Sequence, residues 1–581
     1  MRRERFVSIL FGGAVLTAVV LAPGRASAGT ITVNTLAMTL TKDGKCSLLE
    51  AVTALNNKAA FNECNPGSGA VTITLPPGLG TFIIPPNSTL TITQPVTLMS
   101  AVANTKAHLQ ATPTSTNSEA ILIEPPINAT VTLQDLTIDG IEPGSNMIGI
   151  FAMGGVAGTK LIVNRCEIEY WIGGGILADG VPLTLTTSYV HDNGGVGVDS
   201  IGGLSVNDFG NTKGLFNISN STLSANTADL GGAIFSGASG HSTILNSSIL
   251  TNKADYGAAI FATGSGIIDV TASTIALNTA NVSAAVQGPG VSFNLTETIL
   301  AQNTVTVGSG QFPSEWDKGS KIASFTNSLL DSTMSYSNDG SFAGITIVKS
   351  SGTNVIDIGN VPVVDSPYTL PDLGGSMLDN VPMVRLLPGC PAIDVLTSSV
   401  ASTQGLDQRG YPRGIGNGTT RYDIGAFEFN AKAEAESMFV KETINGAVTH
   451  VSNVPGFTPA GGTGIKFTPK AGLTNNASFT VRLPLVAGAG PSLSLIAQYG
   501  PTAGNYQVGI RKNFNDSFTP IGTMNLYKQQ TALAPFVFAI TNEDLQPQDY
   551  NTMEMQITLV GKDHSSSNNY LYLDSATFFQ P

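Results

Sequence analysis

The chain has 581 residues, and only 12% of them are charged. Its formal net charge of −13 is unfavourable for nucleic acid, which requires a basic face, so we expect no nucleic-acid partner. The same acidity makes an anionic polysaccharide a poor partner unless calcium bridges the two. The length predicts two or more domains, and the abundance of Gly, Ser, Thr and Asn is typical of a β-rich extracellular protein.

Residues 1–28 have the pattern of a secretory signal peptide. Basic residues precede an apolar core, Phe6–Leu21, and the small residues Ala26-Ser-Ala28 mark a cleavage site. A membrane anchor is the alternative, but the core is short and ends in a cleavage pattern. No later stretch reaches the roughly 18 uninterrupted apolar residues that a membrane helix needs. We therefore predict a secreted or cell-surface, extracellular protein with no membrane span after cleavage.

Residues 29–120 are predicted to form an N-terminal cap and the first coils of a solenoid. Ser47–Asn57 is typical of a short amphipathic helix, with Leu48, Val52 and Leu55 on one face. Such a helix can plug an open first coil and hide its unpaired strand edges.

The chain has four cysteines, and only Cys46 and Cys64 are close in sequence. In an oxidising compartment we expect them to form a disulfide that closes a small N-terminal loop. Cys166 and Cys390 are expected to be free and buried. No C-x-x-C pair occurs, so the cysteines predict no metal site.

The segment 121–345 repeats at a near-constant spacing. Asn residues recur 26, 26 and 25 positions apart, each after a similar phrase: Asn226, Asn252, Asn278 and Asn303. Because each repeat holds short β-branched runs and no helical periodicity, we predict the stacked coils of a parallel β-helix. The Asn file is expected at a turn, in the αL conformation, with its amides bonded to the next coil. The predicted inward file is aliphatic: Val190, Leu223, Ile249, Ile275 and Leu300.

Two earlier phrases, ending at Trp171 and Asn193, extend this ladder, and the spacing slips to 33 between Asn193 and Asn226. The slip predicts a protruding insertion around Val206–Gly214. In the predicted register Glu169 stacks near His191 and Tyr170 near Asp192.

This stacking gives the best candidate site on the solenoid. A carboxylate beside a histidine can perform acid–base chemistry, so Glu169, His191 and Asp192 are the candidate catalytic residues. Neighbouring aromatic rings could hold a sugar: Tyr170, Trp171 and Tyr189. The alternative is a solvated outer face with a modest ion pair. The motifs of polygalacturonases are missing from the chain.

Residues 346–430 are predicted to hold the final coils and their closure. They carry a cluster of opposite charges: Asp394, Asp407, Arg409, Arg413, Asp423 and Glu428. A catalytic set is one interpretation of this cluster. We favour the other, a paired network that closes the last coil.

From residue 435 to 581 the repeat is lost and alternating strands separated by turn signals begin, as in a β-sandwich. Here Tyr499 and Tyr506 are the candidate ligand-binding rings, with Tyr527 and Tyr570 as further candidates, and the segment could be a carbohydrate-binding module.

Two motifs resemble known proteins. Cys46-Ser-Leu-Leu-Glu50-Ala resembles the CSLREA motif of exported bacterial β-helix proteins, with Leu49 where that family has Arg. Pro391-Ala-Ile-Asp394, Asp407-Gln-Arg-Gly410 and Asp423-Ile-Gly-Ala-Phe-Glu428 are similar to the ending of choice-of-anchor Q proteins, with Cys390 in place of the usual Ser. The resemblance implies export and a right-handed parallel β-helix, but it defines no single reaction.

Together these observations predict an all-β protein, a right-handed parallel β-helix followed by a jelly-roll-like β-sandwich. The first functional hypothesis is an exported, non-catalytic, monomeric protein that binds a polysaccharide or cell-surface glycan in adhesion or in a matrix. The alternative is a polysaccharide-degrading enzyme, either a glycoside hydrolase or a polysaccharide lyase. No metal or other cofactor is expected, except calcium if the protein is a lyase.

Overall fold

The computed structural model describes most of the chain between residues 29 and 579. Up to residue 356 the gaps are short: 68, 87, 104, 113–118, 125, 127, 143–146, 155–157, 195–201, 209–212, 318, 333, 337–341 and 345. Between 357 and 431 only short stretches are described: 364, 368–369, 382–384, 386, 391–392, 395–397, 407–408, 413 and 422–427. The main later stretches are 432–434, 439–451, 464–473, 475–483, 492–499, 503–511, 517–527, 532–539, 553–561 and 569–579. The predicted signal peptide and Cys390 lie outside the described residues.

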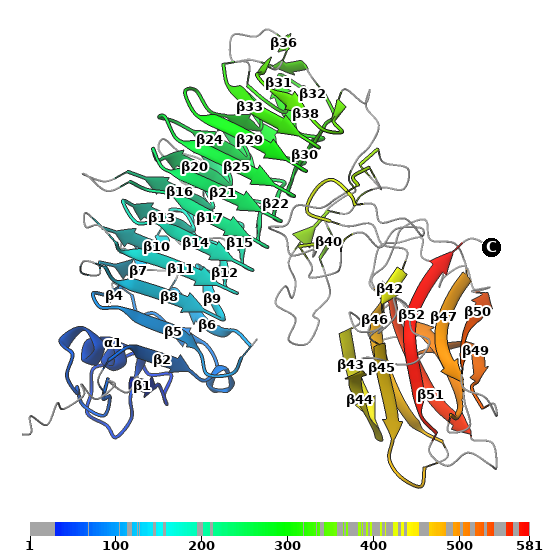
Figure 1. The fold of residues 1–581 in the computed structure, drawn as a ribbon. Helices are drawn as coiled ribbons and strands as arrows, with labels where there is room; N and C mark the ends of the chain where they lie inside the picture. The colour runs from blue at the N-terminus through cyan, green and yellow to red at the C-terminus, as the bar shows by residue number, and fades with distance from the viewer. Residues whose placement is uncertain are drawn as a thin grey trace, which may run out of the picture.

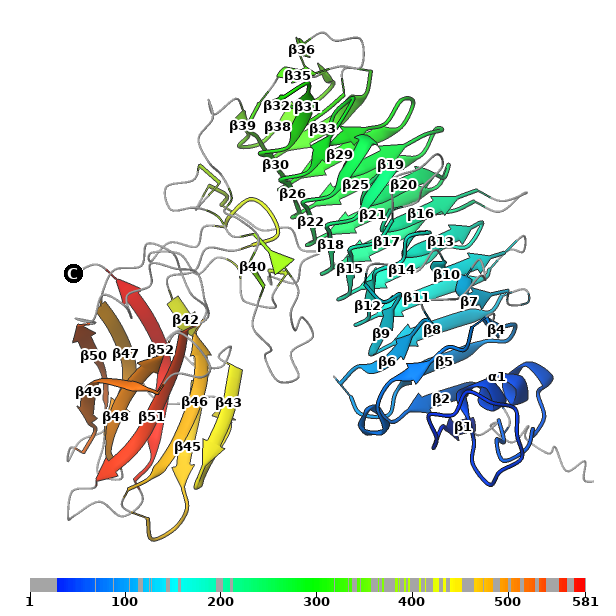
Figure 2. The ribbon, with the colours of Figure 1, turned by 180° about the vertical axis from the view of Figure 1, so that it is seen from behind.

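Parallel strands stack coil upon coil into a β-solenoid, which confirms the predicted parallel β-helix (Figure 1, Figure 2). The first sheet runs in chain order, one strand from each coil: β1 (Gly29–Thr32), β2 (Val71–Leu75), β5 (Val96–Ser100), β8 (Thr130–Gln134), β11 (Lys160–Asn164), β14 (Leu183–Thr186), β17 (Phe216–Ser219), β21 (His241–Leu245), β25 (Ile267–Thr271), β29 (Ser292–Thr296), β33 (Lys321–Thr326) and β37 (Thr346–Ile347), with β38 (Ser350–Ser351) beside β33.

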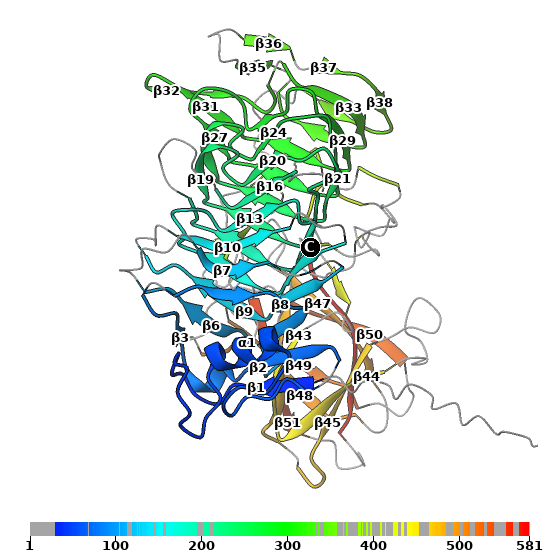
Figure 3. The ribbon, with the colours of Figure 1, turned by 90° about the vertical axis from the view of Figure 1, so that its left-hand side faces the viewer.

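Two further sheets close each coil, and Figure 3 faces the second. The second sheet contains β4 (Leu90–Ile92), β7 (Glu119–Ile123), β10 (Ile148–Met153), β13 (Ile176–Asp179), β16 (Leu204–Asn207), β20 (Ile234–Gly237), β24 (Ile260–Ala262) and β28 (Val286–Gln287). The third sheet contains β3 (Phe82–Ile83), β6 (Ala107–Gln110), β9 (Leu136–Asp139), β12 (Glu167–Glu169), β15 (Tyr189–His191), β18 (Thr222–Ser224), β22 (Ser248–Leu250), β26 (Thr274–Ala276), β30 (Ile299–Ala301), β34 (Leu329–Leu330) and β39 (Val355–Ile356).

Shorter elements accompany the three large sheets. A fourth, smaller sheet contains β19 (Thr227–Leu230), β23 (Lys253–Tyr256), β27 (Thr279–Ala280), β31 (Thr304–Val307) and β32 (Gly310–Pro313). Two hairpins pair β35 (Met334–Tyr336) with β36 (Phe342–Gly344) and β40 (Tyr368–Thr369) with β41 (Pro382–Met383). A single 3-10 turn, η1, spans Pro77–Leu79.

The core of the solenoid is the predicted aliphatic file. Val190 pairs with Leu223, and the pairing continues in register through Ile249 and Ile275 to Leu300. All five side chains are buried. Since side chains alternate across a strand, the flanking residues of the third sheet must point outward.

A ladder of buried Asn side chains ties the coils together at the turn after the third sheet. Asn226 donates both its backbone N–H and its Nδ2 to Oδ1 of Asn252, each at 3.0 Å, and Asn252 does the same to Asn278. The αL part of the prediction is wrong. The residue before each Asn takes the positive φ, as Ala225 (φ 56°) and Thr251 (φ 54°) do, and this turn aims the Asn amide inward.

The spacing slip does not interrupt the ladder. Asn193 donates its backbone N–H to Oδ1 of Asn226 at 3.1 Å, across the longer coil. The insertion predicted at Val206–Gly214 is wrong at its start, because Leu204–Asn207 forms β16 and Val206 is buried. Residues 209–212 lie outside the described part.

A helix covers the first coil, as the sequence predicts. α1 (Leu48–Asn57) begins at Ser47, whose Oγ accepts from the backbone N–H of Glu50, while the Glu50 carboxylate accepts from the N–H of Ser47. Leu48, Val52 and Leu55 are buried against the solenoid core. A disulfide joins Cys46 to Cys64.

The charged segment after the last coil does not close that coil. Gln408 donates to Thr222 Oγ1 at 2.8 Å, and Arg413 donates to Asn246 Oδ1 at 2.8 Å. Most outward side chains of β22 to β34 are apolar, and they pack against this segment: Leu250, Ala276, Ile299, Ala301 and Leu329 contact Val364, Val384, Leu386, Ala392, Leu396 and Ile424. The described residues of this segment therefore cover a side face of the solenoid, and the pairing of the charged cluster stays a prediction; Asp394, Arg409 and Glu428 lie outside the described residues.

The C-terminal strands form two antiparallel sheets with one buried core, consistent with the predicted sandwich. One contains β42 (Lys432–Glu434), β44 (Gly446–Val451), β45 (Gly464–Pro469), β47 (Ser492–Tyr499), β50 (Ala532–Ala539) and β52 (Leu571–Phe579). The other contains β43 (Phe439–Ile444), β46 (Ala477–Leu483), β48 (Asn505–Arg511), β49 (Thr519–Asn525) and β51 (Met553–Gly561). None of the described helices is long and apolar enough to span a bilayer.

The ladder predicts a large cost for a small substitution. Asn252→Ala leaves the buried N–H and Nδ2 of Asn226 without their acceptor, so we expect it to lower the free energy of unfolding by about 2–4 kcal/mol. The outward Asn217, which accepts from Thr243 Oγ1 on the first sheet, is the matched control, and Asn217→Ala should cost less than about 1 kcal/mol. Equal losses in chemical denaturation would contradict the structural role of the ladder.

Candidate functional site

The third sheet presents two files of outward side chains at its N-terminal end. In register, Glu167 lies between Thr137 and Tyr189. Beside them, Glu169 lies between Asp139 and His191. Ile168 points into the core between the two glutamates, so β12 aims both carboxyl groups at the same surface.

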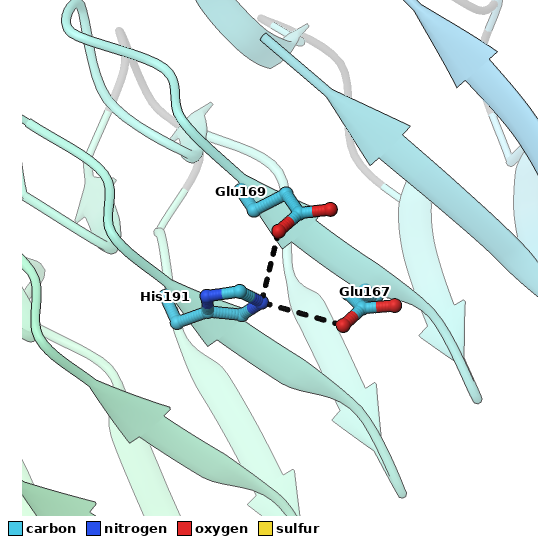
Figure 4. Close-up of side chains that lie close together, drawn as sticks. All are labelled: Glu167, Glu169 and His191. Atoms are coloured by element: carbon cyan, nitrogen blue, oxygen red, sulfur yellow. Dashed lines mark ion pairs between the residues drawn. The ribbon is translucent and has the colours of Figure 1, made fainter. Parts of the chain in front are cut away.

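Glu167, Glu169 and His191 converge, and we call these three residues the outer-face cluster (Figure 4). His191 Nε2 lies 3.4 Å from Oε1 of Glu167 and 3.5 Å from Oε2 of Glu169. The ligand atoms of the three side chains all lie within 4.8 Å of one another. The side chain of His191 is only 8% exposed, and those of Glu167 and Glu169 are 19% and 17% exposed, so the carboxylates form the solvent-facing side of the cluster.

The imidazole is held from two other directions. Its Nδ1 lies 2.7 Å from Oδ2 of Asp192, and its ring stacks on Tyr189 with 3.6 Å between the centroids. Ser224 Oγ donates to the hydroxyl of Tyr189 at 3.2 Å. Asp192 and Tyr189 therefore fix the ring so that Nε2 faces the two glutamates, but that atom makes no hydrogen bond of normal geometry with them.

The two glutamates have different surroundings. Lys106 Nζ lies 3.0 Å from Oε2 of Glu167, and Thr137 Oγ1 donates to the same oxygen at 3.3 Å. Among the described residues, none donates a hydrogen bond to the carboxyl group of Glu169. The neighbouring Asp139 is bonded to His108 at 3.0 Å and accepts from Gln110 at 2.7 Å.

These surroundings separate the pKa values of the pair. Burial tends to raise the pKa of Glu167, but His191 and the charge of Lys106 outweigh it and lower this pKa to about 2. Burial raises the pKa of Glu169 to about 7, against the opposing charge of His191 and together with the like charges of Glu167 and Asp139. Burial tends to lower the pKa of His191, but Asp192 and Glu167 outweigh it, so the pKa is raised.

The structure brings the predicted catalytic residues together but changes the role of one. Glu169 and His191 face each other as the register predicts. Asp192 is exposed and bonds to Nδ1 on the other side of the imidazole, where it orients the ring and does not face the two glutamates. Glu167 and Lys106 were missing from the predicted set. Aligning Cys166-Glu-Ile-Glu169 with the earlier Leu136-Thr-Ile-Asp139 would have shown how far the polar face extends.

Most of the predicted sugar-binding rings are not available. Trp171 and Tyr506 are fully buried. Inside the solenoid Trp171 Nε1 donates to Ile138 O at 3.0 Å, and in the C-terminal sheets the Tyr506 hydroxyl donates to Asn569 O. The ring of Tyr189 is covered by His191. Tyr170 is half-buried and lies edge-on to His191 at 6.2 Å, so it is the remaining platform beside the outer-face cluster. The side chain of Tyr499 lies outside the described residues.

Comparison with solved structures finds similarities at low identity. The enzymatically active domain of bacteriophage CBA120 tailspike protein 4 is 11% identical over 91% of this chain and 65% of that chain, with a TM-score of 0.30. Pectate lyase Pel9A is 14% identical over 70% and 97%, with a TM-score of 0.29. The CBM35 of Paenibacillus barcinonensis is 14% identical over 26% and 98%, with a TM-score of 0.15. No protein-family model and no curated protein sequence matches the chain. At these scores the similarities assign no activity to it.

The split between the glutamates is measurable in solution. In a ¹³C NMR titration of EDTA-treated protein, we expect one glutamate carboxyl to titrate near 7 and its signal to vanish in Glu169→Gln. A second glutamate should stay ionised down to about 2, and Lys106→Met should raise its pKa because the neighbouring cation is lost. Glu63→Gln, at an exposed position, should leave both values unchanged. Titration of every glutamate near the ordinary value of about 4.3 would contradict the described electrostatics.

Proposed function

We propose that this protein is exported and cleaves glycosidic bonds of a polysaccharide at the outer-face cluster. The observation that carries the proposal is a pair of carboxylates on one face of β12, with oxygen atoms within 4.8 Å of each other, beside an oriented histidine. Retaining glycosidases place their two carboxyl groups about 5–5.5 Å apart, so the spacing suits the retaining mechanism.

The hydrogen bonds distinguish the two roles. Lys106 and Thr137 hold Glu167 as a carboxylate, which makes it the nucleophile that attacks the anomeric carbon. Glu169 lacks such a donor among the described residues, so it gives its proton to the glycosidic oxygen as the bond breaks. Water then hydrolyses the glycosyl–Glu167 ester, and Glu169 takes back a proton from that water.

His191 and Asp192 are positioning residues in this proposal. The imidazole packs between Tyr189 and the two carboxyl groups and keeps Glu169 in place. Tyr170 offers a ring edge and hydroxyl next to the reacting groups. With a formal net charge of −13 and the Glu167 carboxylate at the cluster, the substrate class is a neutral or basic polysaccharide.

The wider proposal also includes relationship, location and domain roles. The signal-like residues 1–28 and the Cys46–Cys64 disulfide support export to an oxidising compartment. The CSLREA-like and choice-of-anchor Q-like motifs support a relationship to exported bacterial β-helix proteins. In this proposal the sandwich, residues 435–581, binds the polysaccharide away from the outer-face cluster. The protein acts as a monomer.

The test begins with a glycan array probed with the mature full-length protein, followed by a reducing-sugar assay on the bound glycans. Glu169→Gln should lower kcat by about 10²–10⁴-fold, the range for loss of a general acid. Glu167→Gln should lower kcat by a similar factor. For the wild-type protein, ¹H NMR should show products with retained anomeric configuration.

The matched control is Asp269→Asn, since Asp269 forms an exposed pair with His241 at 2.7 Å on the first sheet. This variant should keep full activity, and all variants should keep the wild-type melting temperature to within a few degrees. Glycan binding without any release of reducing ends would refute cleavage and support the non-catalytic alternative. Release that is unchanged in Glu169→Gln would place the activity elsewhere.

A further inference from the structure

His191 offers a buried ligand atom that the protein itself does not satisfy. Its Nε2 is buried and makes no hydrogen bond of normal geometry. The side chain is only 8% exposed, and stacking on Tyr189 holds the ring in place. With the Nδ1 proton donated to Asp192, a neutral imidazole directs its Nε2 lone pair at the carboxylates of Glu167 and Glu169. A divalent cation placed among these three groups is attracted by both carboxylates and by the Nε2 lone pair.

The spacing of the three groups matches the coordination shell of a small divalent metal. With metal–ligand bonds of about 2.1 Å, two ligands of a tetrahedral ion lie about 3.4 Å apart. The distances from His191 Nε2 to Glu167 Oε1 and Glu169 Oε2 are 3.4 Å and 3.5 Å. The two glutamate oxygens lie within 4.8 Å of each other, so a modest side-chain rotation completes the third edge.

The surroundings also have the features of a metal site. Asp192 accepts the Nδ1 proton of His191 at 2.7 Å, the carboxylate–histidine contact that orients most metal-binding imidazoles. Lys106 and Thr137 bind Oε2 of Glu167 and leave Oε1 to face the cluster. Three carboxyl groups, those of Glu167, Glu169 and Asp192, lie near a single ammonium group, that of Lys106. This excess of acidic groups favours a divalent cation.

We infer that Glu167, Glu169 and His191 bind one divalent transition-metal ion of the zinc type. An imidazole nitrogen among the ligands favours zinc over calcium and magnesium, which prefer oxygen ligands alone. Three protein ligands leave at least one position for water or a sugar hydroxyl. The sequence predicts no metal except calcium for a lyase, because its cysteines form no C-x-x-C pair. The three ligands come together only when adjacent coils stack.

Metal binding would regulate the proposed activity. A zinc ion occupies both carboxylates, so Glu169 can neither hold nor donate its proton while the ion is bound. This consequence rests on the proposed function, whereas the binding of the ion does not.

The test is calorimetric titration of zinc chloride into the untagged, EDTA-treated mature protein. We expect one zinc per chain, weakened at least a hundredfold in Glu169→Gln and in His191→Ala. Asp192→Asn should weaken it about 10–100-fold, as loss of a ligand-orienting carboxylate does. The glutamine and asparagine variants keep the side-chain shape, so they remain informative if His191→Ala does not fold.

The matched control is His241→Ala, because His241 also faces a carboxylate, Asp269, but at an exposed site with a single acid. Zinc affinity should be unchanged in this variant, and zinc should raise the melting temperature of wild type but not of Glu169→Gln. Absence of a one-to-one site, or equal affinity in Glu169→Gln and wild type, would overturn the inference.

The assay also separates this inference from the proposed function. Zinc binding that depends on the cluster, in a protein that releases no sugar from any bound glycan, would leave the metal site standing and remove the catalytic proposal. Sugar release that depends on Glu169, in a protein without cluster-dependent zinc binding, would do the reverse. If both hold, zinc should inhibit release in wild type, and EDTA should restore it.

Discussion

The buried asparagine ladder is the interaction on which the solenoid depends. Each Asn from Asn193 to Asn278 presents its side-chain oxygen to the previous coil and its own N–H and Nδ2 to the next. A buried amide without partners is costly, so each coil is held in register by its neighbours. The ladder ends where Glu315 takes the place of the next Asn and accepts from the backbone N–H of Asn303. The Glu315 side chain also accepts from Asn303 Nδ2, so both donors of the last Asn are satisfied.

The ladder also places the outer-face cluster. Trp171 N–H donates to Asn193 Oδ1, so the coil that carries Glu167 and Glu169 is locked to the coil that carries His191. The residues just before these ladder positions, Tyr170 and Asp192, take the αL turn and stand at the edge of the cluster. The side face of the solenoid is thus divided. Its downstream coils are mostly apolar and covered by the segment after the last coil, whereas its upstream coils are polar and carry the acidic pair and the histidine.

The sequence could predict what depends on periodicity. The regular spacing of Asn226 to Asn303 is enough to predict parallel coils, and the alternation within β12 and β15 is enough to predict that Glu169 faces His191. The prediction that Trp171 is a sugar-binding ring is wrong because its ring points into the solenoid. The sequence of one coil cannot show this orientation, which follows from the hydrogen bonds of Trp171 to Asn193 and Ile138 in the neighbouring coils. The covering segment was misjudged because its partners, such as Leu250 and Ile299, are more than 60 residues away. Their apolar, outward positions were nevertheless visible in the repeat and indicate that something must cover them.

The central claim is that the chemistry of this protein lies on the upstream coils of the solenoid. A crystal structure of the protein with an oligosaccharide that it binds tests this claim most directly. We predict sugar density across β9, β12 and β15, with a glycosidic oxygen within hydrogen-bonding distance of Glu169 and the adjacent anomeric carbon facing Glu167. Sugar bound only to the C-terminal sheets, with water alone over Glu167 and Glu169, would contradict the account.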